Sequence, residues 1–491
     1  MSHMNKLSLL LSILLLISPL LGNEKKPNVL FFLIDDLGWK DLSYAGSKFY
    51  ETPNIDKLAG DGVRFNRANM AAPRCVSSRV GLMTGQVPFR NKLKGKDGIS
   101  RSVKIMPEAF KEEGYKTYFA GKWHLGHGEN EYPDARGFDT NIGGCDYGSP
   151  HSYFFPFHKE GSHPMPNLEK GIEGEYMTDR LTDETIHFIR NHTKSNSDQP
   201  FFAFLSHYGV HTPLQAKADK IKKYEAKLNK LKETQKGEAY FQDHTGWVKG
   251  HQDHPIYAAM IESIDESVGK LRDTLEELGL AENTIIVFTS DHGGLSTTMV
   301  KKGKGREVAT SNLPLRTGKG WLYEGGLRVP FLVCDPKHEG GQTSNHLVNG
   351  TDVYPSLLDL CGLPLKPKQH LDGFSFAKVM RGESYKRPEP IIYHYMFAKV
   401  GTGNTAMAAV IEGSYKLVVL EVEKKIALYN LEEDPAESKD LSKIYPEITE
   451  RLNKIRLKKL KELKIKPLEK SHNFYKTTLQ LLKSAGLEEP N

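Results

Sequence analysis

Four short apolar runs in this chain each end in residues that can bind cations or move protons. The runs and their polar continuations are 29–34 before Asp35 and Asp36, 117–120 before Lys122 and His124, 201–205 before His207 and His211, and 284–289 before Asp291 and His292. If the runs are parallel strands, their carboxyl ends meet at one edge of a sheet, where open α/β sheets bind ligands. The sequence therefore predicts one site lined by carboxylates, imidazoles and a lysine.

The carboxylates at this edge indicate a cation site. Asp35 and Asp36 are adjacent in the chain and repel each other unless a cation or a proton neutralises them. With Asp291 they make a set of hard oxygen ligands, which suits Ca²⁺ or Mg²⁺. His292 adds an imidazole, which suits Zn²⁺ or Mn²⁺ better. The spacing thus predicts a divalent cation and leaves its identity open.

The elements that must position these residues alternate between strand-like and helix-like patterns. Apolar residues between 260 and 278 recur at helical spacing, and Gly279 follows where the helix would end. This alternation favours an α/β fold with a large, mostly parallel mixed sheet flanked by helices. From about residue 376 the strand-like runs become shorter, and we expect a smaller C-terminal α+β subdomain with an antiparallel sheet over 376–491.

Two lysine-rich segments are expected at the periphery. Residues 216–236 combine eight lysines with apolar residues on one side, which predicts an amphipathic helix with a solvated face. A role in binding a polyanion is the alternative for that segment. Residues 450–466 predict a second exposed helix face.

Length and composition set the class of protein. The 491 residues are 38% hydrophobic and 26% charged, which is enough to bury a large core and too apolar for a disordered chain. The 67 Lys and Arg against 61 Asp and Glu give a net charge of +6. No basic stripe with interleaved aromatic residues is present, so we expect no nucleic acid partner. Four cysteines exclude a disulfide scaffold.

The first 22 residues have the pattern of a secretory signal peptide. Lys6 precedes a mostly apolar run over 7–21, and Pro19 and Gly22 close that run before polar residues follow. The run is short for a membrane span, and no other stretch is long and apolar enough for one. We therefore expect residues 1–22 to be removed and the mature protein to be exported, periplasmic or extracellular, without stable membrane insertion.

A further block, CVSSR at 75–79 followed by GLMTG at 81–85, carries a cysteine and an arginine one helical turn apart. Other blocks are TPNIDKLA at 52–59, GVRF at 62–65, GKWHLG at 121–126, HTPL at 211–214, TSDHG at 289–293, PLRTGKGWLYEGGLRVP at 314–330 and LYNLEEDPAE at 428–437. In this order they resemble the formylglycine-dependent (type I) sulfatases of the alkaline phosphatase superfamily, whose signature reads Cys, any residue, Pro, Ser, Arg. The resemblance covers about residues 27 to 445.

The resemblance implies an alkaline phosphatase-like core, with a sulfatase catalytic domain over 27–375. Cys75 would be oxidised to Cα-formylglycine during export by a formylglycine-generating maturation enzyme, and the hydrate of that aldehyde would attack sulfur. The residues implied to hold one Ca²⁺ are Asp35, Asp36, Cys75 as formylglycine, Asp291 and His292. The residues implied to be catalytic are Cys75, Arg79, Lys122, His124, His211 and Lys319.

The same resemblance implies a role for each catalytic side chain. Arg79 and Lys122 would orient and activate the nucleophile, and His124 would take the proton that starts sulfate elimination. His211 and Lys319 would bind sulfate and donate to the leaving alcohol.

The sequence departs from the family pattern at two positions. Ser77 stands where proline is usual, which bears on the conversion of Cys75 and on the machinery that performs it. His292 stands where many members carry Asn, and an Asp-His pair also occurs in the wider superfamily. With Cys75 set aside, at most one disulfide can form among Cys145, Cys334 and Cys361, and we expect Cys334 to be a buried thiol.

The expected substrate is a sulfated polysaccharide or oligosaccharide. The pocket is expected from loops around 140–160, 300–320 and 395–408, with Lys304 and Arg306 available for neighbouring sulfates. Aromatic and imidazole side chains that could stack on a sugar, or else form a hydrophobic flap on the core, are Tyr147, His151, Tyr153, Phe154 and Phe155.

Two alternatives stay open. The first is a phosphodiesterase or phosphonate hydrolase of the same superfamily, whose two-zinc members need further His and Asp ligands. The second is a non-catalytic, carbohydrate-binding pseudo-sulfatase in which Cys75 is never converted.

Overall fold

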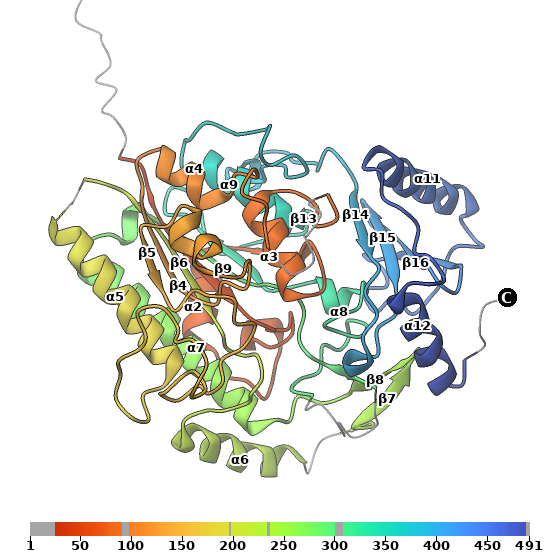
Figure 1. Cartoon of the computed structure of the whole chain (residues 1–491), viewed down its shortest axis with the longest axis horizontal. Helices are drawn as coiled ribbons and strands as arrows, with labels where there is room; N and C mark the ends of the chain where they lie inside the picture. The colour runs from red at the N-terminus through yellow and green to blue at the C-terminus, as the bar shows by residue number, and fades with distance from the viewer. Residues whose placement is uncertain (1–24, 91–97, 196–197, 233–235, 300–307, 488–491) are drawn as a thin grey trace, which may run out of the picture.

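An eight-stranded sheet forms the centre of the larger part of the computed structural model (Figure 1). The structure describes residues 25–90, 98–195, 198–232, 236–299 and 308–487, so the predicted signal peptide lies outside the described residues. In spatial order the strands are β12 (Gln342–Ser344), β2 (Val63–Phe65), β11 (Phe331–Cys334), β9 (Thr284–Ser290), β1 (Asn28–Ile34), β6 (Phe201–His207), β4 (Lys116–Gly121) and β5 (Thr140–Ile142). All neighbours run parallel except β11, which is antiparallel to β2 and β9. The predicted α/β fold with a mostly parallel mixed sheet is confirmed.

The four predicted strands are the central strands of this sheet. Every residue of β1, β6 and β9 is buried, as expected for parallel strands covered on both faces. The register pairs Ile34 at the end of β1 with His207 of β6 and with Ser290 of β9. The polar residues that follow these strands are therefore delivered to the same edge of the sheet.

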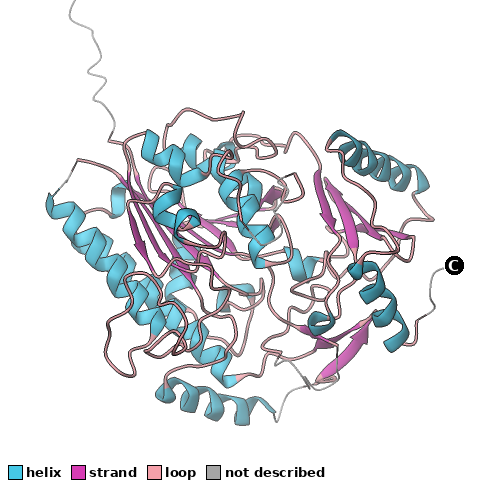
Figure 2. Cartoon of the chain, in the orientation of Figure 1, coloured by secondary structure: helices cyan, strands magenta, loops and turns pink. Residues whose placement is uncertain are grey.

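Helices cover both faces of the sheet (Figures 1 and 2). One face carries α2 (Pro53–Asp61), α5 (Met177–Ser195) and α7 (Pro255–Glu277), with α6 (Ala218–Lys232) packed on α7. The other carries α3 (Cys75–Thr84), α4 (Met106–Glu112), α9 (Val353–Leu360) and α10 (Ala377–Met380). The predicted helix over 260–278 lies within α7, and Gly279 follows it with a φ of 66°. Within the described ranges, no helix combines the length and the apolar character that crossing a membrane requires.

Helix α6 is the amphipathic helix predicted within 216–236, but several of its lysines do not face solvent freely. Lys220 is buried and binds Glu262 at 2.8 Å, and Lys223 binds the same carboxylate at 2.7 Å. Lys227 binds Glu51 at 2.6 Å. These ion pairs attach α6 to the rest of the protein, so the lysines that form them are not available to bind a polyanion.

The C-terminal part contains the expected antiparallel sheet. Its strands are β14 (Ile391–Tyr395), β15 (Met407–Glu412), β16 (Tyr415–Leu420) and β17 (Lys425–Asn430), followed by α11 (Pro446–Glu462) and α12 (Asn473–Ser484). Helix α11 contains most of the lysine-rich segment and packs on β15 and β16. The remaining short elements are β3 (Ala68–Asn69), β7 (Tyr240–Asp243), β8 (Gly246–Lys249), β10 (Thr297–Thr298), β13 (Val348–Asn349) and α8 (Glu324–Leu327). The domain bounds 27–375 and 376–491 stay a prediction.

All four cysteines are free thiols in the structure. Cys75, Cys145 and Cys361 are buried, whereas Cys334 is only partly buried and contacts the carbonyl oxygen of Asp61 at 3.6 Å. The expectation that Cys334 is buried was wrong, because β11 ends at this residue and the chain turns to the surface there.

A buried charge cluster joins the C-terminal sheet to the main body. Lys416 on β16 is fully buried and lies 2.9 Å from Glu324 Oε1 and 2.9 Å from Glu437 Oε1. Arg328 Nε also donates to Glu324, at 2.7 Å, and the Glu324 backbone N–H donates to Glu437 Oε2 at 2.6 Å. Because Glu324 begins α8, the cluster positions the segment between Lys319 and β11.

We predict that Glu437→Gln removes a pH-dependent loss of stability. Burial raises the pKa of Glu437 to about 7, with Lys416 opposing the shift and Glu324 adding to it. A raised carboxyl pKa means that the folded state holds this proton more tightly than the unfolded chain. Protonation of Glu437 therefore stabilises the folded state fully below the ordinary glutamate pKa of 4.5, and this stabilisation is lost as the pH rises through 7.

Thermal unfolding of both proteins should be measured between pH 5 and pH 8. The free energy of unfolding of the variant should increase relative to that of the wild type as the pH rises, by on the order of 2 kcal/mol in total. Glu277→Gln, at an exposed ion pair, is the control and should leave the pH profile unchanged. A difference between wild type and Glu437→Gln that is constant with pH would contradict the assignment.

Candidate active site

Four strand ends, helix α3 and the loop that contains Lys319 bring the predicted residues together at the carboxyl edge of the sheet. Asp35 and Asp36 follow β1, and Asp291 and His292 follow β9, with all four buried. The Asp36 backbone N–H donates to Asp291 Oδ1 at 3.3 Å, and Asp36 itself has a φ of 65°. This left-handed backbone conformation points the two adjacent carboxylates in different directions. Asp35 contacts Lys122, whereas Asp36 contacts Lys319 and His292.

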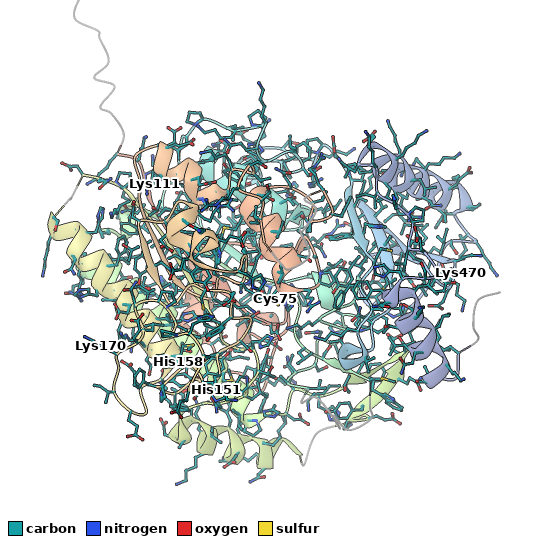
Figure 3. The ribbon with its side chains drawn as sticks, in the orientation of Figure 1. Cys75, Lys111, His151, His158, Lys170 and Lys470 are labelled. Carbon is teal, nitrogen blue, oxygen red and sulfur yellow. The ribbon has the colours of Figure 1, made fainter. Side chains whose placement is uncertain are left out.

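Cys75 begins α3 and lies near the centre of the molecule (Figure 3). Burial acts to raise the pKa of its thiol, but the charges of Lys122 and Lys319 hold that pKa well below the usual range. Side-chain hydrogen bonds with His124 and His292 act in the same direction. The position therefore favours negative charge on whatever group residue 75 carries.

Arg79 lies one turn along α3 and connects the helix to three strand ends. Its Nε donates to Asp291 Oδ2 at 2.9 Å, and its Nη1 donates to the carbonyl of Lys122 at 2.7 Å and to Ser206 Oγ at 2.8 Å. Nη2 is 3.9 Å from Asp35 Oδ1. The guanidinium is buried, so these contacts fix where α3 begins relative to the sheet.

Two lysines neutralise the two adjacent carboxylates. Lys122 Nζ donates to Asp35 Oδ2 at 2.5 Å, and Lys319 Nζ donates to Asp36 Oδ1 at 2.6 Å. Burial nevertheless raises the pKa of Asp35 to about 6, and Asp291 adds to this effect while Lys122 opposes it. For Asp36, burial also acts to raise the pKa, but Lys319 and the neighbouring histidines hold it well below its usual range.

Two further histidines lie at the same edge. Burial lowers the pKa of His124, and it lowers the pKa of His211 to about 4, so both imidazoles are neutral near pH 7. His211 Nδ1 lies 2.7 Å from the carbonyl of Thr212, to which it donates because a carbonyl can only accept. Its Nε2 therefore carries the lone pair and lies 3.9 Å from Asp36 Oδ2.

Several atoms of the cluster fit a cation. Asp35 Oδ1 and Asp36 Oδ2 are buried and make no hydrogen bond among the described residues. His292 Nε2 lies 3.2 Å from Asp36 Oδ1 and 3.4 Å from Asp291 Oδ1. His292 Nδ1 lies 2.9 Å from the carbonyl of Gly293, an arrangement that leaves Nε2 for a ligand. Burial acts to lower the pKa of His292, but Asp291 and Asp36 raise it to about 9, which shows how strongly the carboxylates attract positive charge.

The ligand atoms form one compact group. Those of Asp35, Cys75, Asp291 and His292 all lie within 4.8 Å of one another. Asp35 and Asp36 form a second such group with His211, and it shares Asp35 with the first. The two groups therefore form one continuous cluster of possible metal ligands, with His211 at its side.

The predicted pocket residues have mixed outcomes. Tyr153 is fully buried, and its hydroxyl donates to the carbonyls of Tyr208 and His211, so it packs on the core and cannot stack on a sugar. His151 is exposed on the same loop (Figure 3). Lys304 and Arg306 lie outside the described residues.

Sequence reasoning missed the residues that support the site from within the strands. Ser206 Oγ accepts from Arg79 and donates to the carbonyl of Lys122 at 2.8 Å. Ser290 Oγ donates to the carbonyl of His292 at 2.8 Å and accepts from the Leu37 backbone N–H at 3.0 Å. Each serine lies at the end of an otherwise apolar run, and that position was the available indication.

Comparisons with known proteins agree with this arrangement. The family model described as Sulfatase matches residues 27–363, and the model described as N-sulphoglucosamine sulphohydrolase, C-terminal, matches residues 317–465. The chain is 30% identical to N-acetylgalactosamine-6-sulfatase of Rattus norvegicus over 80% of this chain and 72% of the relative. It is 30% identical to a sulfatase of Formosa agariphila over 90% of each chain.

Solved structures show the same fold. Ps i-CgsB, determined in complex with k-i-k-neocarrahexaose, superposes with a TM-score of 0.71 at 28% identity, covering 94% of this chain and 98% of that chain. The phosphonate monoester hydrolase of Agrobacterium radiobacter superposes with a TM-score of 0.62 at 19% identity, covering 91% of this chain and 97% of that chain. The latter likeness concerns the fold alone. Because the first family model spans most of the chain around the cluster at Cys75, the protein belongs to the sulfatase family of the alkaline phosphatase superfamily and is a sulfuric ester hydrolase.

Proposed function

We propose that this enzyme removes sulfate from a sulfated oligosaccharide or polysaccharide, with formylglycine at position 75 and one Ca²⁺ beside it. The observation that carries the proposal is the environment of Cys75 in a member of the sulfatase family. The thiol starts α3 between two lysines and two histidines, against three buried carboxylates. A sulfate ester needs such a set: a nucleophile, positive charge for its oxygens and groups that move protons.

The modification and the ion would each supply one element of the chemistry. Formylglycine at position 75 would supply, as its hydrate, a hydroxyl nucleophile and a second hydroxyl through which sulfate can leave. A Ca²⁺ held by Asp35, Asp36, Asp291, His292 and residue 75 would supply positive charge for the nucleophile and for sulfate.

The side chains of the chain itself bind and orient. Lys122 and Lys319 place two ammonium groups beside residue 75, where they would bind the non-bridging sulfate oxygens. His124 is hydrogen-bonded to residue 75 and neutral, so it can accept a proton from that residue. His211 holds its Nε2 on the side of Asp36, where, once protonated, it would donate to the leaving alcohol.

A sugar substrate is supported by the relatives. One relative is named for the 6-sulfate of N-acetylgalactosamine, and Ps i-CgsB was determined with a carrageenan-type hexaose. The proposal therefore names sulfated galactose-type sugars as the first substrates to test. Export of the mature protein and removal of residues 1–22 belong to the same proposal, because a polymer of this kind is met outside the cell.

The first prediction concerns residue 75. Mass spectrometry of the peptide that contains it, from protein exported by its native host, should show formylglycine. Cys75→Ala should keep the fold and lose sulfate release from sulfated galactosides, carrageenan oligosaccharides included. Cys334→Ala, at a free thiol elsewhere, is the matched control and should keep full activity.

An intact cysteine in active protein, or sulfate release that survives Cys75→Ala, would overturn the proposed nucleophile. A converted enzyme that releases no sulfate but cleaves phosphodiesters or phosphonates would favour the phosphonate hydrolase alternative. Glycan binding without any turnover by the unconverted protein would favour the pseudo-sulfatase.

The second prediction concerns the cation. Ca²⁺ should raise the thermal midpoint of chelator-treated protein, because an ion that binds only the folded state stabilises it by mass action. Asp36→Asn should lose most of this rise and most of the activity, since it removes one charged ligand. Asp198→Asn, at a side chain that is 98% exposed, should behave as the wild type. The single-ion site would be contradicted by two results together. The thermal midpoint of the wild type would not change with Ca²⁺, and binding of two transition-metal ions would restore activity.

The third prediction concerns Arg79. Arg79→Lys should destabilise the protein by about 3 kcal/mol, because a lysine cannot reach Asp291, Ser206 and the Lys122 carbonyl together and leaves buried groups unpaired. Sulfate release should fall at temperatures where the variant is still folded. Arg190→Lys, at an exposed pair with Glu277, should change neither property. Equal effects in the two variants would show that Arg79 has no special role.

A further inference from the structure

An arginine next to residue 75 has no role in the cluster described so far. Arg74 directly precedes α3, and Cys75 is the first residue of that helix. The carbonyl of Pro73 accepts a hydrogen bond of 2.8 Å from the backbone N–H of Gly320, the residue after Lys319. The backbone of Arg74 is therefore fixed between residue 75 and the loop that contains Lys319.

Aromatic residues of the C-terminal part hold the Arg74 side chain. Its guanidinium carbon lies 4.2 Å from the centroid of the Phe397 ring, just after β14. Phe397 packs in turn on Tyr395, the last residue of β14, with centroids 5.9 Å apart, and on Phe474 of α12, with centroids 4.6 Å apart. The carbonyl of Phe397 accepts from Asn404 Nδ2 at 2.6 Å. The C-terminal sheet and α12 thus fix the position of this guanidinium.

The Tyr395 hydroxyl lies near both Arg74 and residue 75. Burial raises the pKa of this hydroxyl, while the charge of Arg74 and a hydrogen bond with it act in the opposite direction, and negative charge at Cys75 adds to the increase. Because a guanidinium can only donate, the phenol oxygen accepts in that hydrogen bond. The hydrogen of the hydroxyl has no acceptor among the described residues, although Tyr395 is only 8% exposed. A buried donor without a partner therefore lies beside the arginine.

The guanidinium itself has donors left for a ligand. Its five N–H groups lie in one plane, and stacking on Phe397 occupies a face of that plane and not its edges. In the part of the chain that the structure describes, no carboxylate forms an ion pair with Arg74. A half-buried guanidinium with unpaired N–H groups suits an anion with two oxygens side by side, such as a sulfate ester or a carboxylate.

We propose that Arg74, with the Tyr395 hydroxyl beside it, binds a second anionic group of the substrate, a sulfate ester or a carboxylate on the same sugar unit or the next one. This site rests on the proposed function and deepens it, because it selects sugar chains with several negative charges over sugars with a single sulfate. Arg74 and Tyr395 are specificity-determining residues here, and Phe397 is a positioning residue.

The charges near residue 75 explain why this position would select the substrate. Lys122 and Lys319 already face carboxylates, at 2.5 Å and 2.6 Å, whereas Arg74 faces an aromatic ring and a hydroxyl. A sugar with one sulfate would occupy the cluster around residue 75 and leave the guanidinium without an anion. A second anionic group would pair with it, and little side-chain freedom would be lost because Phe397 already holds the guanidinium in place.

Binding is measured by calorimetric titration of the full chain with Cys75→Ala, saturated with Ca²⁺, so that the probes are not desulfated. The probes are a galactose-type disaccharide with one sulfate, the same disaccharide with two sulfates, and a monosulfated galactose joined to a uronic acid. The parent should bind one of the two dianionic probes at least about tenfold more tightly than the monosulfated probe. Preference for the disulfated probe identifies a sulfate at Arg74, and preference for the uronic acid identifies a carboxylate.

Three variants test the assigned residues on this background. Arg74→Gln should bring the ratio of the two dissociation constants close to one, and Tyr395→Phe, which removes only the hydroxyl, should lower it about threefold. Arg74→Lys should keep part of the ratio, because it keeps the charge and loses the paired N–H groups. Arg381→Gln, at an arginine that pairs with Asp359 outside the cluster around residue 75, is the matched control and should keep the ratio of the parent. If Arg74→Gln does not fold, Tyr395→Phe decides.

Arg74 is not an anion site if the parent binds neither dianionic probe more tightly than the monosulfated one, or if folded Arg74→Gln keeps the preference of the parent. Equal weakening of all three probes in Arg74→Gln would also overturn the assignment, because a purely structural role does not depend on the second charge. Sulfate release by the converted wild type is measured separately. Preference for a dianionic probe without any sulfate release would contradict the proposed function and retain the anion site, whereas release without such a preference would do the reverse.

Discussion

The arrangement of the site depends on one buried guanidinium. Arg79 hydrogen-bonds to Asp291 after β9, to the Lys122 carbonyl after β4 and to Ser206 in β6. A charge so far from solvent is tolerated because several of its donors are paired with good geometry. Since Arg79 and Cys75 belong to the same helix, the contacts that neutralise the guanidinium also determine where residue 75 lies. The position of residue 75 is therefore a consequence of an electrostatic requirement in the core.

Charge balance explains why the centre is suited to an anionic ester. Three carboxylates, from Asp35, Asp36 and Asp291, face three basic side chains, from Arg79, Lys122 and Lys319. The pKa of Asp35 is nevertheless raised to about 6 by burial, so compensation of the carboxylates is incomplete. A divalent cation would complete that compensation and make the site net positive, which favours a sulfate monoanion over neutral molecules. Burying these carboxylates together costs free energy, and the same carboxylates would bind the cation.

Much of this arrangement could be predicted because it follows from strand ends. A parallel sheet places all its carboxyl ends at one edge, so the apolar runs before Asp35 and Asp291 predicted the cluster without any knowledge of register. The periodicity of the sequence could not predict which residue each charged side chain pairs with. The lysines of α6 looked available to a polyanion, yet Lys220 and Lys223 are committed to Glu262, a residue some forty positions away. Pairings at that separation are decided by packing, not by local pattern.

The Lys319 segment shows why the predicted domain boundary does not separate function cleanly. Lys319 belongs to the cluster around Cys75, but two residues later Trp321 is buried among side chains of β14 to β17 and donates to the carbonyl of Thr402 at 3.1 Å. Five residues after Lys319, Glu324 binds the fully buried Lys416 of β16. The C-terminal sheet therefore holds the loop that brings an ammonium group to Asp36. A chain that ended near residue 375 would contain every predicted catalytic residue and yet lack the surface that positions one of them, so the antiparallel sheet helps to hold the cluster around Cys75 in place.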